Sequence, residues 1–162
     1  MQQNKIKIIA IFLILIAGFS FNIRKAIAQE RPPLFFREDW KETPPETPVT
    51  QEHVANKDLI LTLHGPGKEG IRKSNHDQPA DDPFYIWSGM AKGNWAVSLR
   101  HVTNNVDLRG QSRIRWRAKQ AGLRTLHPII KLANGIWFVA NGYDDASSDW
   151  REHEQGIGCY HC

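Results

Sequence analysis

Two short loops concentrate the oxygen-bearing side chains that could bind a metal ion. Residues 75–83 read Asn-His-Asp-Gln-Pro-Ala-Asp-Asp-Pro, and residues 141–145 read Asn-Gly-Tyr-Asp-Asp. Calcium takes about six to eight oxygen ligands and would accept such loops. Neither loop has EF-hand spacing, and Asp and Asn are also ordinary residues of solvated turns. We therefore predict no metal site and no cofactor, with calcium as the open alternative.

Carboxylates could also act as the acid and the nucleophile or base that glycoside hydrolysis needs. Several acids cluster near the C-terminus, but no pattern selects a pair; they are Asp144, Asp145, Asp149, Glu152 and Glu154. The chain has no Gly-x-Ser-x-Gly elbow, no His-Glu-x-x-His pair and no Gly-x-x-x-x-Gly-Lys-Ser/Thr phosphate loop. The catalytic residues of an enzyme interpretation therefore stay unassigned.

Aromatic side chains are the more suggestive group, because their flat rings suit the apolar C–H faces of sugars. Five of them fall on expected strands or strand edges: Tyr85, Trp87, Trp95, Trp116 and Trp137. A buried position is the ordinary place for any one of these rings. Alternation puts Trp116 in the core, so Trp87 and Trp137 are the better candidates for exposed ligand-binding residues, together with Tyr85.

Residues 113–119 alternate strictly between cations and apolar residues, which is typical of a strand with one wet face. Arg113, Arg115 and Arg117 lie on that face. Pairing with acids on a neighbouring strand is one explanation of the row. The other is a cationic groove for an acidic sugar or similar anion, which the arginine fork would bind.

The N-terminus has the features of a bacterial-type export signal. Lys5 and Lys7 precede an apolar run, and Ala26-Ile27-Ala28 is a small-residue cleavage pattern. An uncleaved anchor helix is the alternative, although polar residues dilute the run. Cleavage would remove residues 1–28 with four of the 21 basic residues and none of the 17 acidic ones, leaving 17 of each sign. A neutral exported chain gives no reason to expect nucleic acid as a partner.

Four parts follow from this reading: a signal peptide (1–28), a Pro-rich lead-in (29–55), a β-sandwich domain (56–155) and an irregular tail (156–162). The lead-in is expected to run extended and dock its aromatic residues on the domain, because proline discourages helices and central strands. The tail contains Cys159 and Cys162, an incidental pair or at best half of a metal site.

Short runs of β-type residues separated by Gly, Asn, Asp and Pro predict an all-β fold, a jelly-roll β-sandwich. The expected strands are 59–64, 84–88, 95–102, 113–120, 126–132 and 136–140. Asn134-Gly135 predicts a hairpin closed by a two-residue type I′ turn. A short helical turn is possible at 50–55.

Two segments resemble carbohydrate-associated proteins. One combines Asn-Val-Asp-Leu-Arg-Gly at 105–110 with Ile-Arg-Trp-Arg at 114–117, and the other is Ser-Asp-Trp-Arg-Glu at 148–152. They are similar to the strand entries of galactose-binding-like jelly rolls in carbohydrate-binding modules. Residues 33–40 resemble the start of secreted β-sandwich proteins grouped with 3-keto-disaccharide hydrolases and concanavalin-like glycosidases. The resemblance implies a sugar-related extracellular role and transfers no catalytic residue.

The chain stops sooner than those sandwiches do, so we expect a sandwich incomplete at its C-terminus, a truncated product with an unpaired sheet edge. The expected function is glycan binding outside the cell or in the periplasm, with no membrane span after signal cleavage. A glycoside hydrolase is the first alternative. An envelope domain that binds protein through the cationic strand is the second.

Overall fold

The computed structural model describes residues 31–78, 80, 83–122 and 124–157. The expected signal peptide, Cys159 and Cys162 lie outside the described residues. Nearly all of the described residues, from Pro32 onward, belong to one compact unit. The Pro-rich segment therefore belongs to the same compact unit as the strands.

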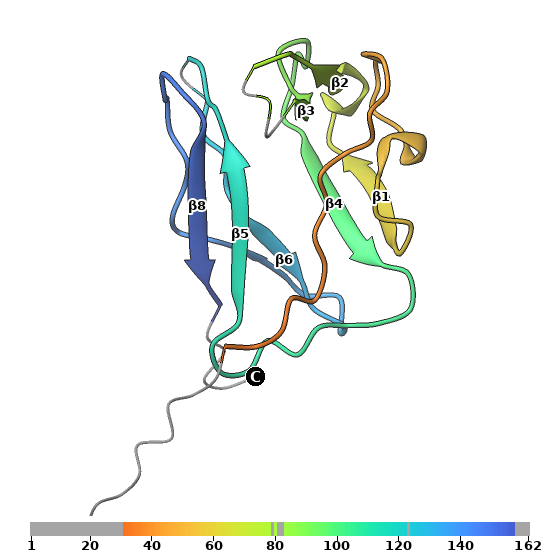
Figure 1. Ribbon diagram of the computed structural model, residues 1–162. Coiled ribbons are helices and arrows are strands. Elements are labelled where there is room, and N and C mark those ends of the chain that lie inside the picture. The colour runs from red at the N-terminus through yellow and green to blue at the C-terminus, as the bar shows by residue number, and fades with distance from the viewer. Residues whose placement is uncertain (1–30, 79, 81–82, 123, 158–162) are drawn as a thin grey trace, which may run out of the picture. The chain divides into compact units, whose positions relative to one another are not determined.

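The described part is built from strands and contains only two short 3-10 helices, so the all-β class is confirmed (Figure 1). In chain order the elements are η2 (Gln51–His53), β1 (Leu59–His64), η3 (Lys68–Gly70), β2 (Arg72–Asn75), β3 (Phe84–Trp87), β4 (Ala96–His101), β5 (Arg113–Ala118), β6 (Ile129–Lys131), β7 (Trp137–Val139) and β8 (Arg151–Gly156). The strands form four antiparallel pairs: β1 with β4, β2 with β3, β5 with β8, and β6 with β7. No helix in these residues is both long and apolar enough to cross a bilayer.

All six expected strands form, and β1 has the predicted bounds. The strand β2 was not predicted, because its sequence Arg-Lys-Ser-Asn has low β-propensity. It forms through long-range pairing with β3 on one side and an antiparallel bridge between Glu46 and Lys73 on the other. Gly156, expected to begin the tail, ends β8 opposite Arg113.

The hairpin at Asn134-Gly135 is confirmed, but its expected turn type is wrong. Gly135 has φ +88°, whereas Asn134 is not among the residues with positive φ that a type I′ turn requires. The Gly135 amide donates to the Leu132 carbonyl at 2.9 Å, and the Leu132 amide donates to Ile136 at 2.8 Å. The loop thus has three residues and ends on a left-handed glycine, which closes β6 onto β7.

The alternation expected for β5 is present, with Arg113, Arg115 and Arg117 exposed and the residues between them half-buried or buried. The strand β8 supplies the acids: Arg113 and Arg115 both pair with Glu154, and Arg115 also reaches Glu152 at 3.1 Å. The explanation of the cationic row by cross-strand pairing is therefore confirmed for these two arginines.

The buried apolar core lies mainly in the first half of the described chain. Its residues are Val49, Val54, Leu59, Ile71, Ala91 and Ala118, and only the last comes after residue 91. The Pro-rich segment contributes Val49, whose amide donates to the Ile71 carbonyl at 2.8 Å, and Phe35 packs 5.4 Å from the His101 ring. The lead-in docks on the strands as expected.

Lys73 is fully buried in this region without an acidic partner in the described part of the chain. Its ammonium donates to the Ser74 carbonyl at 3.0 Å and lies 4.7 Å from the centre of the Phe84 ring. Burial lowers the pKa of Lys73, because an apolar environment disfavours the charged form.

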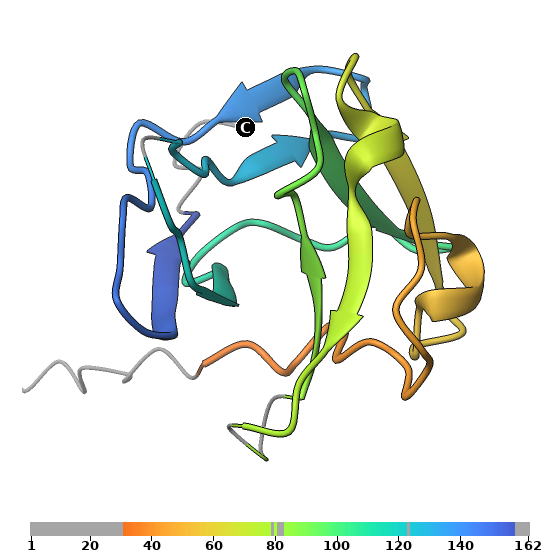
Figure 2. The ribbon, with the colours of Figure 1, turned by 90° about the horizontal axis from the view of Figure 1, so that it is seen from above.

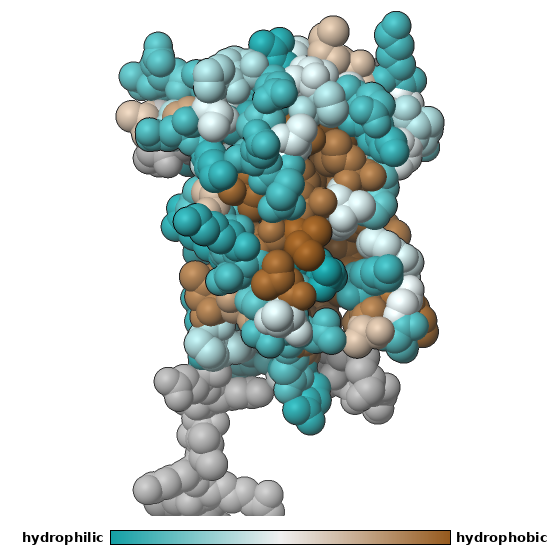
Figure 3. Space-filling view, turned by 90° about the vertical axis from the view of Figure 1, so that its right-hand side faces the viewer, coloured by the Kyte–Doolittle hydropathy of each residue, from teal (hydrophilic) through white to brown (hydrophobic). Residues whose placement is uncertain are grey.

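Many large apolar side chains stay at the surface, among them Trp87, Ile136, Trp137, Phe138 and Val139. Figure 3 shows one face on which apolar side chains form a central band between polar ones. Exposed apolar patches of this kind mark interaction sites on folded domains.

Candidate ligand-binding face

Tyr85 and Trp87 lie on the same face of β3, because side chains two residues apart on a strand point to one side. Tyr85 is half-buried, whereas Trp87 is 46% exposed. Across the sheet they stand opposite Ser74 and Arg72 of β2. The sequence-based expectation that Trp87 is exposed is confirmed.

Tyr85 belongs to a three-ring cluster that joins β3 to the segment before β8. Its ring lies 4.9 Å from His76 and 5.4 Å from Trp150, and the Trp150 ring meets it edge-on at 72°. His76 also lies 6.0 Å from Trp150. Both ring nitrogens of His76 are buried without a hydrogen-bond partner among the described residues. We call Tyr85, Trp87 and Trp150 the β3 aromatic face.

Arg117 connects this face to β5. Its guanidinium carbon lies 5.9 Å from the centre of the Trp150 ring, within the range of a cation–π contact. Six residues were expected at the site. The structure places two of them, Tyr85 and Arg117, in contact with Trp150. A third, Trp87, lies on the same face of β3 as Tyr85.

The Trp87 ring is held against the turn that follows β3. A Cβ atom added to Gly89 would lie 1.9 Å from the Cζ2 atom of Trp87, so only glycine leaves room for the ring there. Arg124 holds the same turn, because its guanidinium donates to the carbonyls of Ser88 at 3.1 Å and Ala91 at 3.0 Å. Trp87 is therefore an exposed ring on a hydrogen-bonded turn.

The other expected site residues lie elsewhere. Trp137 is 45% exposed, as expected, but its ring contacts His64 edge-on at 5.8 Å and the Lys131 ammonium at 5.2 Å. Hydrogen bonds from Arg115 and then Arg113 lower the pKa of Glu154, and the bond to Glu154 raises the pKa of Arg115. These two arginines are occupied within the β5–β8 sheet.

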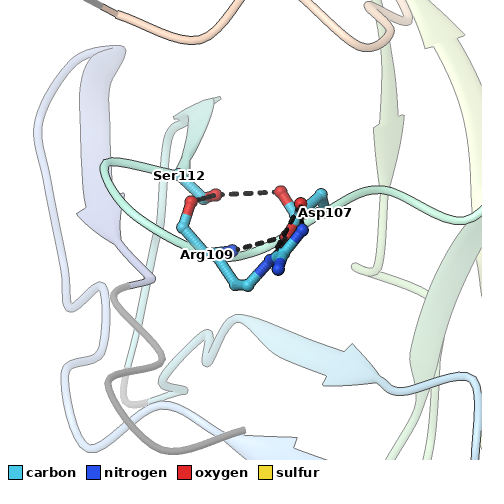
Figure 4. A network of polar contacts seen from close by, with 3 residues as sticks. All are labelled: Asp107, Arg109 and Ser112. Carbon is cyan, nitrogen blue, oxygen red and sulfur yellow. Dashed lines mark hydrogen bonds and ion pairs between the residues drawn. The ribbon is translucent and has the colours of Figure 1, made fainter. Parts of the chain in front are cut away.

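Asp107, part of the sugar-associated resemblance, fixes the turn before β5 (Figure 4). Its carboxylate accepts bonds from the Arg109 amide at 3.0 Å and from the Arg109 guanidinium at 2.6 Å. The Ser112 hydroxyl donates to the carbonyls of Asp107 and Arg109. The turn closes with Gly110 at φ +75°. Asp107 therefore has a structural role, in ordering the entry to β5.

The Arg109 hydrogen bonds lower the pKa of Asp107 from 3.8 to about 2. Because the folded carboxyl has the lower pKa, its ionised form favours the fold above about pH 4, and this contribution disappears as the pH falls through about 2. A carboxyl ¹³C NMR titration should give a midpoint near 2 for Asp107, and Arg109→Ala should move it toward 3.8. A wild-type midpoint near 3.8 would contradict the contact.

A second set of polar groups lines an open depression of about 530 Å³ at the Pro-rich segment. Its lining residues are Lys41, Thr43, Pro44, Pro45, Glu46, Glu52 and His53. His53 is buried and accepts the Thr50 amide on Nδ1 at 2.8 Å, so its Nε2 carries the proton and donates to Glu46 at 3.0 Å. The sequence did not predict this pair, because no local pattern links His53 to Glu46, seven residues earlier.

Asp144 is buried and faces His153 of β8, with Oδ1 and Nε2 3.1 Å apart. The His153 ring stacks on Trp116, its cross-strand neighbour in β5, at 5.3 Å and 13°. Trp116 is half-buried there and does not lie in the core as expected. The loop at 141–145 therefore directs Asp144 toward β8. The loop at 75–83 is described only in part.

No cluster of three or more His, Cys, Asp or Glu side chains suited to a metal ion occurs within residues 31–78, 80, 83–122 and 124–157. No protein-family model, curated protein or solved structure matches this chain. The β3 aromatic face and the depression at Glu46 are the two described parts of the molecule with the geometry of a binding site.

Proposed function

We propose that this protein is an exported β-sandwich domain that binds a glycan across the β3 aromatic face. The observation that carries the proposal is the Trp87 ring, which is 46% exposed, seated on the Gly89 turn and two residues along β3 from Tyr85. A fixed, exposed indole offers flat apolar area at low entropic cost, which suits the C–H face of a sugar ring.

Polar recognition in this proposal comes from the arginines around the face. Arg117 is held over Trp150, and Arg124 is held at the turn beneath Trp87. Guanidinium groups donate to sugar hydroxyls, and they bind the carboxylates of acidic sugars through two parallel bonds. Trp137 is left out because its ring contacts His64 and Lys131. Arg113 and Arg115 are left out because Glu152 and Glu154 occupy their guanidinium groups.

We also propose that the four antiparallel pairs are arranged as a jelly roll. The spacing of the strands and the resemblance at 105–110 and 148–152 support this arrangement. The proposal also keeps cleavage after residue 28 and a location outside the cell or in the periplasm, on the strength of the leader pattern. Binding of this kind requires no cofactor and no nucleic acid.

Screening the purified chain on a glycan array, followed by product analysis on each hit, tests the proposal. We expect binding without turnover. If the chain binds no glycan on the array, acidic sugars included, the proposed glycan partner is contradicted.

A glycoside hydrolase is the second candidate, favoured by the depression that carries both Glu46 and Glu52. Glycosidases use two carboxyl groups that face each other across the sugar, about 5–9.5 Å apart. The bond from His53 fixes the Glu46 carboxylate, while Glu52 remains exposed. If array hits are hydrolysed, Glu46→Gln and Glu52→Gln should each abolish turnover while leaving affinity intact. Full turnover in both variants would exclude this depression as the active site.

A further inference from the structure

The strand β7 and the residue before it are exposed on both faces. Ile136 and Phe138 point to one side and are each 52% exposed, while Trp137 and Val139 point to the other at 45% and 61%. Figure 2 shows β7 (medium blue) beyond β6 at the rim of the domain. This surface is apolar and lies apart from the β3 aromatic face.

The outer edge of β7 carries unpaired backbone groups. The Leu132 amide donates to the Ile136 carbonyl, and the Ala140 amide donates to the Pro128 carbonyl. These two bonds show which cross-strand pairs of the hairpin are hydrogen-bonded. Since bonded and non-bonded pairs alternate in antiparallel strands, Phe138 bonds to Ile130, whereas Trp137 and Val139 direct their N–H and C=O groups outward. No other group in the described part of the chain bonds to these outward amides.

The two edges of the hairpin differ in protection. The strand β6 is preceded by Pro128 and carries Lys131, and both proline and lysine block edge pairing. Residues 132–140 contain no charge and no proline. Two other strands have their outer edges covered: the Gln51 side chain bonds to Leu59 and Leu61 of β1, and Glu46 bridges β2.

We propose that β7 pairs antiparallel with β7 of a second copy of this chain, with Phe138 on the twofold axis. In that register Trp137 lies opposite Val139 of the other copy, and these two residues exchange both backbone bonds in each half of the interface. The result is a four-stranded sheet in the order β6, β7, β7, β6. Phe138 packs on its own counterpart, and aromatic and β-branched cross-strand pairs stabilise such sheets.

Charge and backbone hydrogen bonding favour a second copy of this chain as the partner of β7. An uncharged strand meets its own copy without like-charge repulsion, whereas pairing through β6 would bring Lys131 near its counterpart. A lipid surface would cover the side chains but leave the outward amides and carbonyls without partners, which is costly in hydrocarbon. A three-residue strand is a small interface, so the dimer should be weak and dependent on concentration.

Disulfide trapping in the full chain tests the register. In a Cys159→Ser, Cys162→Ser background, Phe138→Cys should form a covalent dimer under mild oxidation, since the two copies of residue 138 face each other. The matched control is Ile136→Cys, which has the same exposure. Its two copies would lie about 14 Å apart along the strands, beyond the reach of about 7 Å for a disulfide.

Sedimentation velocity provides a second readout that needs no cysteine. The wild-type chain should shift from monomer to dimer as its concentration rises, and Val139→Lys should abolish the shift with an unchanged circular dichroism spectrum, because it places a charge at the pairing edge. A wild-type chain that stays monomeric at all concentrations, or equal crosslinking of the 136 and 138 variants, would overturn the proposal.

Discussion

Replacing Ile71 with alanine should lower the free energy of unfolding by about 2–5 kcal/mol, as large-to-small changes in cores do. Ile71 is fully buried, and its backbone joins η3 to the Pro-rich segment through bonds to Lys68 and Val49. Only six apolar residues are buried in the described part of the chain, so few neighbours remain to compensate for the cavity. Urea unfolding followed by tryptophan fluorescence measures the loss.

The control for this prediction is Ile136→Ala, the same chemical change at a side chain that is 52% exposed. That variant should unfold within about 0.5 kcal/mol of wild type, because exposed substitutions usually change stability little. Similar losses in both variants would show that the core does not lie around Ile71.

Replacing Trp87 with alanine should weaken glycan binding at least about 30-fold, the equivalent of about 2 kcal/mol lost at a central aromatic contact. The indole is the exposed flat surface of the proposed site. Gly89→Ala should also weaken binding, because the new Cβ would occupy the place of the Trp87 ring. Isothermal titration calorimetry with an array hit measures both affinities.

Trp137→Ala is the matched control, since Trp137 has nearly the same exposure but contacts His64 and Lys131 in another part of the domain. Its affinity for the glycan should equal that of wild type. If loss of Trp137 weakens binding as much as loss of Trp87, the ligand does not sit on the β3 aromatic face.

Local patterns were sufficient to predict most strands. Alternation marked β5, and the glycine at 135 marked the hairpin, because both signals arise from neighbouring residues. The strand β2 was missed because its polar sequence adopts a strand only by pairing with β3 and Glu46, which are distant in the chain. The turn type was missed because Asn134 tolerates a positive φ without requiring it.

The candidate site was predictable only in part. The exposure of Trp87 follows from its place at the end of a strand. Arg113 and Arg115 of β5 pair with an acid of the neighbouring strand, as the alternation predicted. The positions of Trp150, His76 and Arg124 could not be foreseen, because each contact joins segments with no shared local pattern. The pair of Asp149 and Trp150 was noticed, but only as a strand entry.

The indole N–H resonances of the six tryptophans test the binding face most directly. During titration with a glycan from the array, the ¹H–¹⁵N signals of Trp87 and Trp150 should move, while those of Trp116 and Trp137 stay in place. Signals that move at Trp137 and not at Trp87, or a saturated complex in which neither Trp87 nor Trp150 responds, would contradict the proposed face.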